Sequence, residues 1–327
     1  MNFKYPKRLT LANLPTPIVK LRDSANSPSI YMKRDDLTGI ALSGNKIRKL
    51  EFVAVDALKQ GADTLITCGG IQSNHARATA VTATMLGLKS ILVLRGEQPE
   101  IADGNLLMNN ILGAEIRFIT AEEYSNSVMD IMSDIAHNLE SKGRKGYVIP
   151  EGASDALGAI GYMHAIKEIR EQAELLDLEF DYIVNATGSG GTQAGLIMGK
   201  KLYDYSPAIL GVNVCDDASY FENKIMNIIK SAEEKFGNRF KIKSRDIKIA
   251  DGYVGMGYAL NKPDEIEFIV DFARTHGIFL DPVYTGKAMI GLYDLIKKGK
   301  FNKRNKILFI HTGGIYGIFP KRELFVK

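Results

Sequence analysis

The sequence predicts an α/β protein made of two open parallel-sheet domains with a cleft between them. Short apolar runs alternate with stretches of helical periodicity along the 327 residues, and this pattern starts again near Asp155. No linker rich in proline, glycine or serine separates the two halves, so the chain is expected to cross directly between them. Residues 1–48 and 155–327 are expected to form a large domain, and residues 49–154 a small domain.

The small domain is expected to contain four parallel strands with helices between them. Runs of β-branched and other apolar residues, each followed by a helical pattern, are typical of such units. The expected strands are Thr64–Thr67, Ser90–Leu94, Glu115–Ile119 and Tyr147–Ile149, and the expected helices are Ser73–Leu86, Gly104–Leu112 and Ala121–Glu140.

The large domain repeats this alternation on a longer stretch of chain. The expected strands are Ile30–Asp36, Tyr182–Ala186, Ala208–Val214 and Lys306–Ile310, and the expected helices are Asp155–Leu175, Gln193–Leu202, Pro263–His276 and Thr285–Lys297. A further helix is expected to begin near Lys46 and to end at Gly61, because Ile47, Leu50 and Val53 recur at helical spacing.

Composition and charge exclude several classes of protein. The net charge of +4 is small and the basic residues are scattered, which argues against a nucleic-acid partner. No apolar run is long enough to span a membrane, and the first residues lack the apolar core of a signal peptide. Two distant cysteines, Cys68 and Cys215, indicate a reducing compartment, so a cytoplasmic protein is expected. The five histidines show no metal-ligand spacing, so no bound metal is expected.

Lys46 is the first candidate catalytic residue. It follows Ser43-Gly44-Asn45 and lies in the first turn of the expected helix. The positive end of the helix dipole and the neighbouring Arg48 and Lys49 are expected to disfavour its protonated form. A neutral lysine amine can form a Schiff base with a carbonyl compound. A solvated lysine on a helix surface is the common alternative.

A glycine-rich loop is the second candidate. Gly188, Ser189, Gly190, Gly191 and Thr192 follow a strand and open a helix, an arrangement that presents backbone N–H groups and hydroxyls to one phosphate. No Gly-Lys-Ser/Thr follows, so the loop is not a Walker A motif. Gln193 stands where a dinucleotide fingerprint has its third glycine, and Asp216 lies further along than that fingerprint requires. Dinucleotide binding and a structural turn remain alternatives.

Two further loops follow expected strands. Ser73-Asn74-His75 opens a helix, where side chains and backbone N–H groups could bind a carboxylate or an aromatic oxygen. Ser73 could equally be a plain helix N-cap. His311-Thr312-Gly313-Gly314 follows the last strand, and its glycines allow close backbone approach, although a simple turn would also fit. A lysine whose protonated form is disfavoured, a loop that suits one phosphate and a polar cleft together favour pyridoxal phosphate as cofactor.

The sequence resembles the pyridoxal-phosphate enzymes of the tryptophan-synthase-β fold type (fold type II). Within them it is similar to the group of 1-aminocyclopropane-1-carboxylate deaminases and D-cysteine desulfhydrases. The blocks that carry the resemblance cover nearly the whole chain in the family's order: Thr16-Pro17, Lys33-Arg34-Asp35-Asp36-Leu37, Gly44-Asn45-Lys46-x-Arg48-Lys49-Leu50-Glu51, Gln72-Ser73-Asn74-His75, Gly190-Gly191-Thr192-Gln193-Ala194-Gly195, Asp281-Pro282-Val283-Tyr284-Thr285-Gly286-Lys287 and His311-Thr312-Gly313-Gly314.

The resemblance implies a role for each matching position. Lys46 would bond the cofactor aldehyde and later move the α-proton. Asn74 would bind the phenolic oxygen of the cofactor, Thr285 would face its ring nitrogen, and the loop from Gly188 to Thr192 would hold its phosphate. Ser73 would bind the substrate carboxylate and, with Lys46 and Tyr284, act in catalysis. The substrate face would be completed by His75, Tyr258, Tyr284 and Thr312. Ser43 departs from the glycine usual in the family, and the family implies a homodimer.

Two positions favour the desulfhydrases over the deaminases. Deaminases of this family have glutamate and leucine where this chain has Thr285 and Thr312. A threonine would leave the ring nitrogen largely unprotonated, which favours loss of a good β-leaving group over opening of a cyclopropane. The expected reaction is elimination of D-cysteine to pyruvate, ammonia and hydrogen sulfide. The alternatives are 1-aminocyclopropane-1-carboxylate deaminase or L-cysteate sulfo-lyase activity, a dinucleotide-dependent oxidoreductase, and a non-catalytic amino-acid-binding protein. Both threonines could also be packing residues only.

Overall fold

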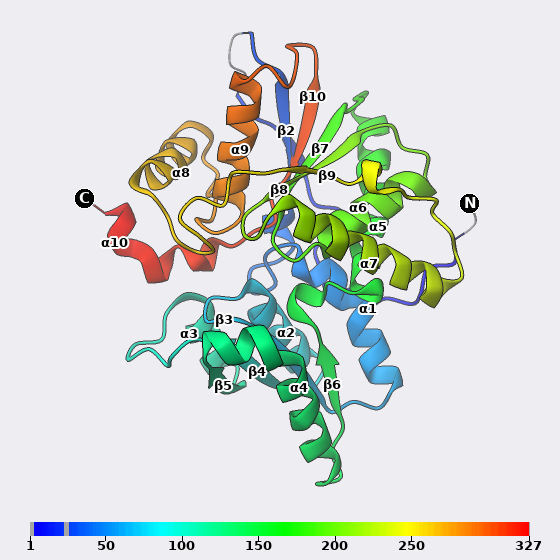
Figure 1. Cartoon of the computed structure of the whole chain (residues 1–327), viewed down its shortest axis with the longest axis vertical. Helices are drawn as coiled ribbons and strands as arrows, with labels where there is room; N and C mark the ends of the chain where they lie inside the picture. Colours follow the sequence, from blue (N-terminus) through cyan, green and yellow to red (C-terminus); the bar gives the residue numbers. More distant parts are fainter. Residues whose placement is uncertain (1–2, 23–25, 327) are drawn as a thin grey trace.

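The computed structural model describes residues 3–22 and 26–326 and contains two β-sheets with helices on both faces of each. Figure 1 shows the six-stranded sheet in the upper half and the four-stranded sheet in the lower half. The strand orders are β1-β2-β10-β7-β8-β9 and β5-β4-β3-β6. The predicted α/β class with two open parallel sheets is therefore confirmed.

The six-stranded sheet is parallel except at one edge, where β1 pairs antiparallel with β2. Its strands are β1 (Ile18–Lys20), β2 (Ser29–Lys33), β10 (Lys306–Ile310), β7 (Tyr182–Thr187), β8 (Ala208–Asn213) and β9 (Lys248–Ala250). Successive side chains of β10 enter opposite cores: Leu308 and Ile310 pack in one, and Ile307 and Phe309 in the other. Burial on both faces explains why this strand is continuously apolar.

Helices cover the two faces of this sheet. One core contains residues from α5 (Ala156–Leu175), α6 (Gly191–Leu202) and α7 (Ala218–Phe236), and the other contains residues from α8 (Pro263–His276) and α9 (Thr285–Lys297). The short helix α10 (Arg322–Phe325) lies near the carboxyl terminus.

The four-stranded sheet is entirely parallel. Its strands are β5 (Glu115–Ile119), β4 (Lys89–Arg95), β3 (Thr64–Gly70) and β6 (Gly146–Ile149). The helix α4 (Ala121–Glu140) packs on one face, while α2 (Asn74–Met85) and α3 (Gly104–Ile111) pack on the other. Parallel order places the carboxyl ends of β3 and β4 at one edge of the sheet, where α2 begins.

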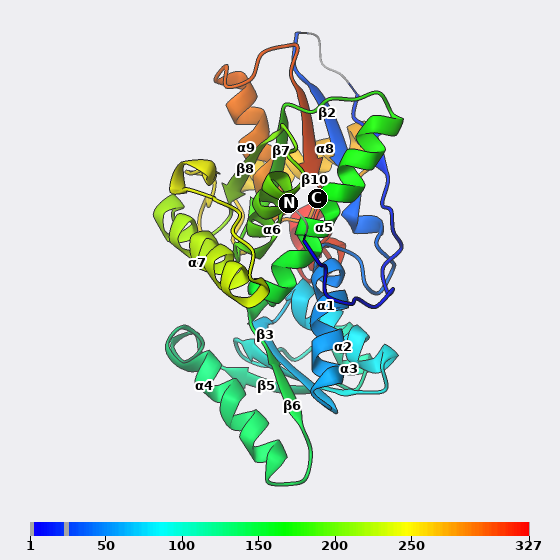
Figure 2. The ribbon, with the colours of Figure 1, turned by 90° about the vertical axis from the view of Figure 1, so that its right-hand side faces the viewer.

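The helix α1 (Lys46–Lys59) joins the two halves of the molecule (Figure 2). Its apolar residues Ile47, Leu50 and Val53 are buried in the same core as α5. A Cβ atom on Gly161 of α5 would lie 2.3 Å from the Arg48 carbonyl oxygen, so the two helices can approach this closely only with glycine there. Because α1 is tightly packed on α5, the amino end that carries Lys46 is held rigidly.

Most predicted elements are confirmed, several with small shifts at their ends. The predicted strand Ile30–Asp36 is too long, because β2 ends at Lys33 and Asp35–Leu37 form a 3-10 turn. That turn directs the buried Asp35 carboxylate at Arg48, with Oδ1 2.8 Å from Nη2. The prediction omitted β1, β9, α7 and α10. The domain boundaries at residues 48/49 and 154/155 stay a proposal, and no helix in the described part of the chain is long and apolar enough to cross a membrane.

Candidate active site

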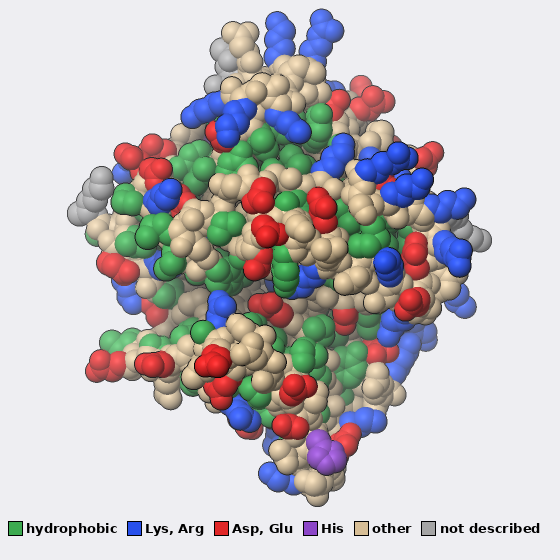
Figure 3. All heavy atoms as spheres, viewed as in Figure 1, with side chains coloured by type: hydrophobic (Ala, Val, Ile, Leu, Met, Phe, Trp, Pro, Cys, Tyr) green, Lys and Arg blue, Asp and Glu red, His purple; other side chains and the backbone are tan. Residues whose placement is uncertain are grey.

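A cavity of about 440 Å³ lies between the two sheets. The space-filling view shows a notch between the two halves of the molecule, with acidic and basic side chains mixed over the surrounding face (Figure 3). The cavity wall includes most of the predicted residues: Lys46, Ser73, Asn74, His75, Gly188, Ser189, Gly190, Thr192, Tyr258, Tyr284 and Thr312. Gly191 and Thr285 are not part of this wall.

The turn before Lys46 is fixed by contacts with two distant loops. Gly44 has a φ of +112°, and a Cβ atom there would lie 2.7 Å from the Thr312 carbonyl oxygen. The Asn45 backbone N–H donates to the same oxygen at 3.1 Å, and the Asn45 side chain donates to Thr192 Oγ1 at 3.0 Å. Glycine is therefore required at position 44. The turn places Lys46 between the carboxyl end of β10 and the amino end of α6.

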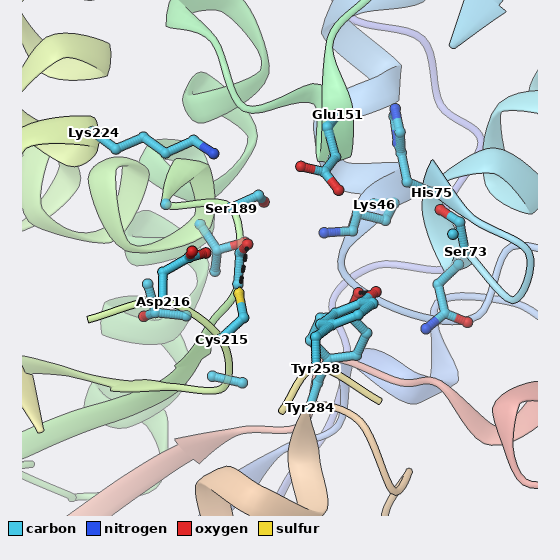
Figure 4. Close-up of a pocket in the computed structure, with 18 of the residues that line it drawn as sticks. Lys46, Ser73, His75, Glu151, Ser189, Cys215, Asp216, Lys224, Tyr258 and Tyr284 are labelled. Atoms are coloured by element: carbon cyan, nitrogen blue, oxygen red, sulfur yellow. Dashed lines mark hydrogen bonds between the residues drawn. The ribbon is translucent and has the colours of Figure 1, made fainter. Parts of the chain in front are cut away.

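The Lys46 amine is suited to nucleophilic chemistry. Burial lowers its pKa to about 8, and the nearby Glu151 carboxylate partly opposes this shift. The lowered pKa confirms the expected direction, and its largest cause is burial, which the prediction did not include. Arg48 is occupied elsewhere, since its guanidinium donates to Asp35 and to Glu168 Oε2, the latter at 2.9 Å. Figure 4 shows Glu151 above Lys46 in the cavity.

The glycine loop forms one end of the cavity at the start of α6. Ser189 Oγ lies 2.7 Å from Ser154 Oγ, and the Lys224 chain packs over Gly190, whose Cβ position would lie 3.8 Å from Lys224 Cγ. The Lys49 ammonium approaches from beneath, donating to the Gly152 carbonyl oxygen at 3.0 Å. Neither lysine forms an ion pair within residues 3–22 and 26–326. Backbone N–H groups and two lysine side chains therefore surround this loop, which suits a phosphate dianion.

The start of α2 presents polar groups to the opposite end of the cavity. Ser73 caps the helix, with Oγ accepting the Ala76 N–H at 3.1 Å, so its hydroxyl proton can still be donated. Asn74 Oδ1 accepts from Asn105 at 3.1 Å, which leaves the Asn74 amide N–H₂ group as a donor.

His75 is neutral in this environment. Thr67 Oγ1 donates to the Ile149 carbonyl oxygen and lies 2.8 Å from His75 Nε2, so Nε2 must carry the proton. Burial and the positive charges of Lys46 and Lys49 lower the pKa of His75 well below its usual value. Its Nδ1 atom is buried without a hydrogen-bond partner within the described residues, and the Pro150 carbonyl partly opposes the lowering of its pKa.

Tyr258 and Tyr284 line a third side of the cavity. The hydroxyl oxygens of Tyr258 and Tyr284 lie 2.5 Å apart, and burial raises the pKa of Tyr258 to about 12. One hydroxyl donates to the other, so one proton of the pair remains available to a ligand. The Thr285 hydroxyl donates to Asp281 Oδ1 at 2.7 Å, so towards a ring nitrogen its oxygen could only accept.

Sequence reasoning assigned no role to several cavity residues with polar or charged side chains, or to one buried lysine. Arg95, Tyr124, Glu151 and Lys224 line the cavity, and Lys49 lies beneath the glycine loop. Lys49 follows Lys46 by three residues, so in a helix the two lie on the same face, and this spacing is visible in the sequence. The position of Glu151, two residues after the end of the strand β6, was a second signal. Lys224 gave none, because its position depends on how α7 packs.

Comparisons with known proteins agree with this geometry. Residues 9–313 match the family described as "Pyridoxal-phosphate dependent enzyme". A "Putative 1-aminocyclopropane-1-carboxylate deaminase" of Thermotoga maritima is 45% identical over 98% of this chain and 100% of its own length. A "Bifunctional D-cysteine desulfhydrase/1-aminocyclopropane-1-carboxylate deaminase, mitochondrial" of Arabidopsis thaliana is 44% identical over 95% of this chain and 79% of its own. The crystal structure of an "ACC deaminase homologue" is 41% identical, with a TM-score of 0.88 over 97% of this chain and 95% of its own.

The residues present fit pyridoxal phosphate. A Cβ atom on Gly188 would lie 3.0 Å from the Tyr284 ring, and one on Gly191 would lie 2.7 Å from Lys49 Nζ, so the loop is open only because these residues are glycines. Lys46 supplies an amine of lowered pKa, Asn74 a free amide donor, and Lys49 with Lys224 two positive charges. The chain therefore belongs to the pyridoxal-phosphate-dependent enzyme family and, within it, to the group whose members are named 1-aminocyclopropane-1-carboxylate deaminases and D-cysteine desulfhydrases.

Proposed function

We propose that this enzyme eliminates hydrogen sulfide from D-cysteine, consuming one water and releasing pyruvate and ammonia. The observation that carries the proposal is the Lys46 amine, which has a pKa of about 8 and lies in the cavity opposite the Tyr258–Tyr284 pair. An amine with this pKa has a far larger neutral fraction near physiological pH than an ordinary lysine, and the neutral form can attack a carbonyl carbon and can take a proton. When bound, pyridoxal phosphate supplies the aldehyde and an electron-withdrawing ring for the charge left at Cα.

The residues around Lys46 have distinct proposed tasks. Ser73 donates its free hydroxyl proton to the substrate carboxylate, and the Asn74 amide donates to the phenolic oxygen of the cofactor. Lys46 removes the proton at Cα, and its ammonium form is then stabilised by Glu151. The tyrosine pair excludes water from one side and keeps one hydroxyl proton for the substrate. His75 and Thr312 complete the substrate wall.

The phosphate end of the site is also a proposal. The loop Gly188–Thr192 provides backbone donors and the hydroxyls of Ser189 and Thr192, while Lys49 and Lys224 provide positive charge. Thr285 is proposed to accept from a protonated ring nitrogen, because its own hydroxyl proton is held by Asp281 Oδ1. This differs from the unprotonated nitrogen expected from the sequence, which Thr285 could not bond. The homodimer and the cytoplasmic location stay predictions.

Opening of 1-aminocyclopropane-1-carboxylate is the second candidate, because relatives at 44–45% identity bear that name. Both reactions use the same amine, carboxylate subsite and cofactor. They differ in product, since D-cysteine gives pyruvate and sulfide, whereas the cyclopropane gives a four-carbon oxo acid without sulfide.

The test compares wild type with Lys46→Ala. It records the visible spectrum with added cofactor and the products formed from D-cysteine and from 1-aminocyclopropane-1-carboxylate. Lys59→Ala is the matched control, because Lys59 lies at the far end of the same helix and is exposed. We expect a visible band and sulfide plus pyruvate from wild type and Lys59→Ala, and neither from Lys46→Ala. A band with four-carbon product and no sulfide would favour the second candidate. A wild-type protein that never develops a band with added cofactor would refute both.

A further inference from the structure

Arg95 stands at the junction of the active-site cavity and a second cavity of about 260 Å³. It is the last residue of β4, where it pairs with Gly70 of β3, and it is half-buried. The two cavities share Gly70, Asn74, Arg95, Tyr258 and Tyr284, and none of these belongs to the glycine loop. Arg95 therefore lies on the side of the site that is proposed to hold the substrate.

Two tyrosine rings hold the Arg95 guanidinium in place. Its central carbon lies 5.2 Å from the centroid of Tyr124 and 5.3 Å from that of Tyr258. Tyr124 comes from α4 beside the small sheet, and Tyr258 from the loop before α8 beside the large sheet. Stacking on aromatic faces fixes the plane of a guanidinium while leaving its N–H groups free to donate.

The hydroxyls of these rings are used elsewhere. The Tyr124 hydroxyl donates to Glu151 Oε1 at 2.9 Å, and the Tyr258 hydroxyl is paired with Tyr284. Within residues 3–22 and 26–326, the Arg95 side chain makes no hydrogen bond and no ion pair. The buried Arg48 differs, because it donates to two carboxylates.

The Arg95 guanidinium has five N–H donors and faces a ligand cavity, so it suits an anionic ligand. Two anions of the loaded site already have partners in the proposed function: the phosphate at the Gly188–Thr192 loop and the substrate carboxylate at Ser73. The remaining negative charge that could reach Arg95 is on the substituent at the substrate Cβ.

We propose that Arg95 is a specificity-determining residue that binds an anionic sulfur substituent, a thiolate or sulfonate, at Cβ of the substrate. This inference rests on the proposed β-elimination. It disfavours 1-aminocyclopropane-1-carboxylate, whose single anion is the α-carboxylate. It also separates sulfur-containing substrates from amino acids with an uncharged β-substituent of similar size.

The test uses holoenzyme and two non-reacting ligands of similar length, 3-sulfopropanoate and butanoate, titrated by calorimetry. The variants are Arg95→Gln and Arg95→Lys. Arg117→Gln is the control, because Arg117 is an exposed arginine on the adjacent strand β5 and lines neither cavity. We expect wild type and the control to bind 3-sulfopropanoate about ten- to a hundred-fold more tightly than butanoate, as a charge-assisted contact provides. Arg95→Gln loses this preference, and Arg95→Lys keeps part of it.

Turnover gives a second readout. The kcat/KM for D-cysteine should fall about tenfold or more in Arg95→Gln, and that for 3-chloro-D-alanine, whose β-substituent is uncharged until it leaves, should fall by a smaller factor. A wild type without preference for the sulfonate, or an equal loss of chloroalanine turnover in Arg95→Gln, would overturn the inference. In both cases an intact visible band and chloroalanine turnover by wild type would leave the proposed function standing. Absence of band and turnover with every substrate would instead defeat the proposed function.

Discussion

The Lys49 ammonium lies 2.7 Å from the point that a Cβ atom on Gly191 would occupy. Lys49 is completely buried, and burial lowers its pKa well below the usual lysine value. Among the described residues its amine hydrogen-bonds to the Gly152 carbonyl oxygen and Ser154 Oγ and to no carboxylate. A buried lysine without a carboxylate partner is costly, and a bound phosphate would remove much of that cost. This arrangement links the size of residue 191 directly to cofactor binding.

Gly191→Ala should weaken pyridoxal phosphate binding at least tenfold. Its methyl group would meet Lys49 Nζ and Ser154 Oγ, the latter at 2.6 Å, and would push the ammonium out of position. Equilibrium titration of the apo protein measures the affinity. Gly237→Ala is the control, because Gly237 has a φ of +65° with nothing within 4 Å of its Cβ position. That variant should lose about 1 kcal/mol of stability through strain alone and keep its affinity. Equal affinities in the two variants would contradict the prediction.

The rate at which apo protein develops the visible band should depend on the protonation of Lys46. Only the neutral amine attacks, so the rate rises with pH and reaches half its maximum near pH 8, where the Lys46 pKa lies. Glu151 opposes the lowering of this pKa, so Glu151→Gln should move the midpoint to lower pH by on the order of 0.5 pH unit. Stopped-flow absorbance across pH 6–10 measures it. Glu140→Gln, an exposed change on α4, should leave the midpoint in place. A midpoint that rises in Glu151→Gln would refute the assignment.

Much of this fold could be predicted from the sequence because its signals are local. Strands such as β5 and β10 and helices such as α4 and α8 have the predicted ends, since apolar periodicity and capping residues lie within each element. The helix α7 was missed although Phe221, Ile225, Ile229 and Ala232 recur at helical spacing. β1 and β9 are three-residue edge strands, too short to show a periodic pattern.

The residues of the candidate site also fall into two groups, those with a local sequence signal and those without one. Lys46, Ser73 and the glycine loop follow strands or open helices, which marks them in the sequence. Arg95 directly follows the predicted strand Ser90–Leu94, but the sequence does not show its partners, because they come from long-range packing. Lys224 gave no local signal. Arg95 contacts Tyr258 only because a loop of the large sheet meets the end of β4. The cause of the lowered Lys46 pKa was missed for the same reason: burial and Glu151 depend on the closed fold.

Glu168→Gln should destabilise the protein strongly at neutral pH and less at acid pH. Glu168 Oε2 accepts from Arg48 at 2.9 Å and Oε1 accepts from Lys33, and these partners overcome burial and lower its pKa from 4.5 to about 2. A depressed carboxyl pKa contributes stability that is complete above the unfolded value and is lost as pH falls towards 2. The lowering of the Glu168 pKa corresponds to about 3 kcal/mol of the free energy of unfolding. This is comparable to the cost of breaking a buried ion pair.

Urea unfolding at pH 7 and pH 3 measures this effect. The difference between wild type and Glu168→Gln should shrink as pH falls through the window from 4.5 to about 2. Glu171→Gln is the control, because Glu171 forms an exposed pair with Lys167 at 3.7 Å. It should change stability by less than about 0.5 kcal/mol. A Glu168→Gln deficit that is equal at both pH values would show that its charge is not the cause.

Thr285→Val should disturb both the start of α9 and the cofactor. The Thr285 hydroxyl donates to Asp281 Oδ1 and accepts the Asp281 N–H at 2.8 Å, while Asp281 Oδ2 accepts the N–H groups of Val283 and Tyr284. Valine leaves the buried Asp281 N–H without a partner, which costs about 1–3 kcal/mol. Thr285→Ser keeps the hydroxyl and should retain most of this stability. If Thr285 accepts from the ring nitrogen as proposed, the visible band of the holoenzyme should shift in Thr285→Val and not in Thr285→Ser. A band that keeps its position in both variants would leave Thr285 with only its structural contact to Asp281.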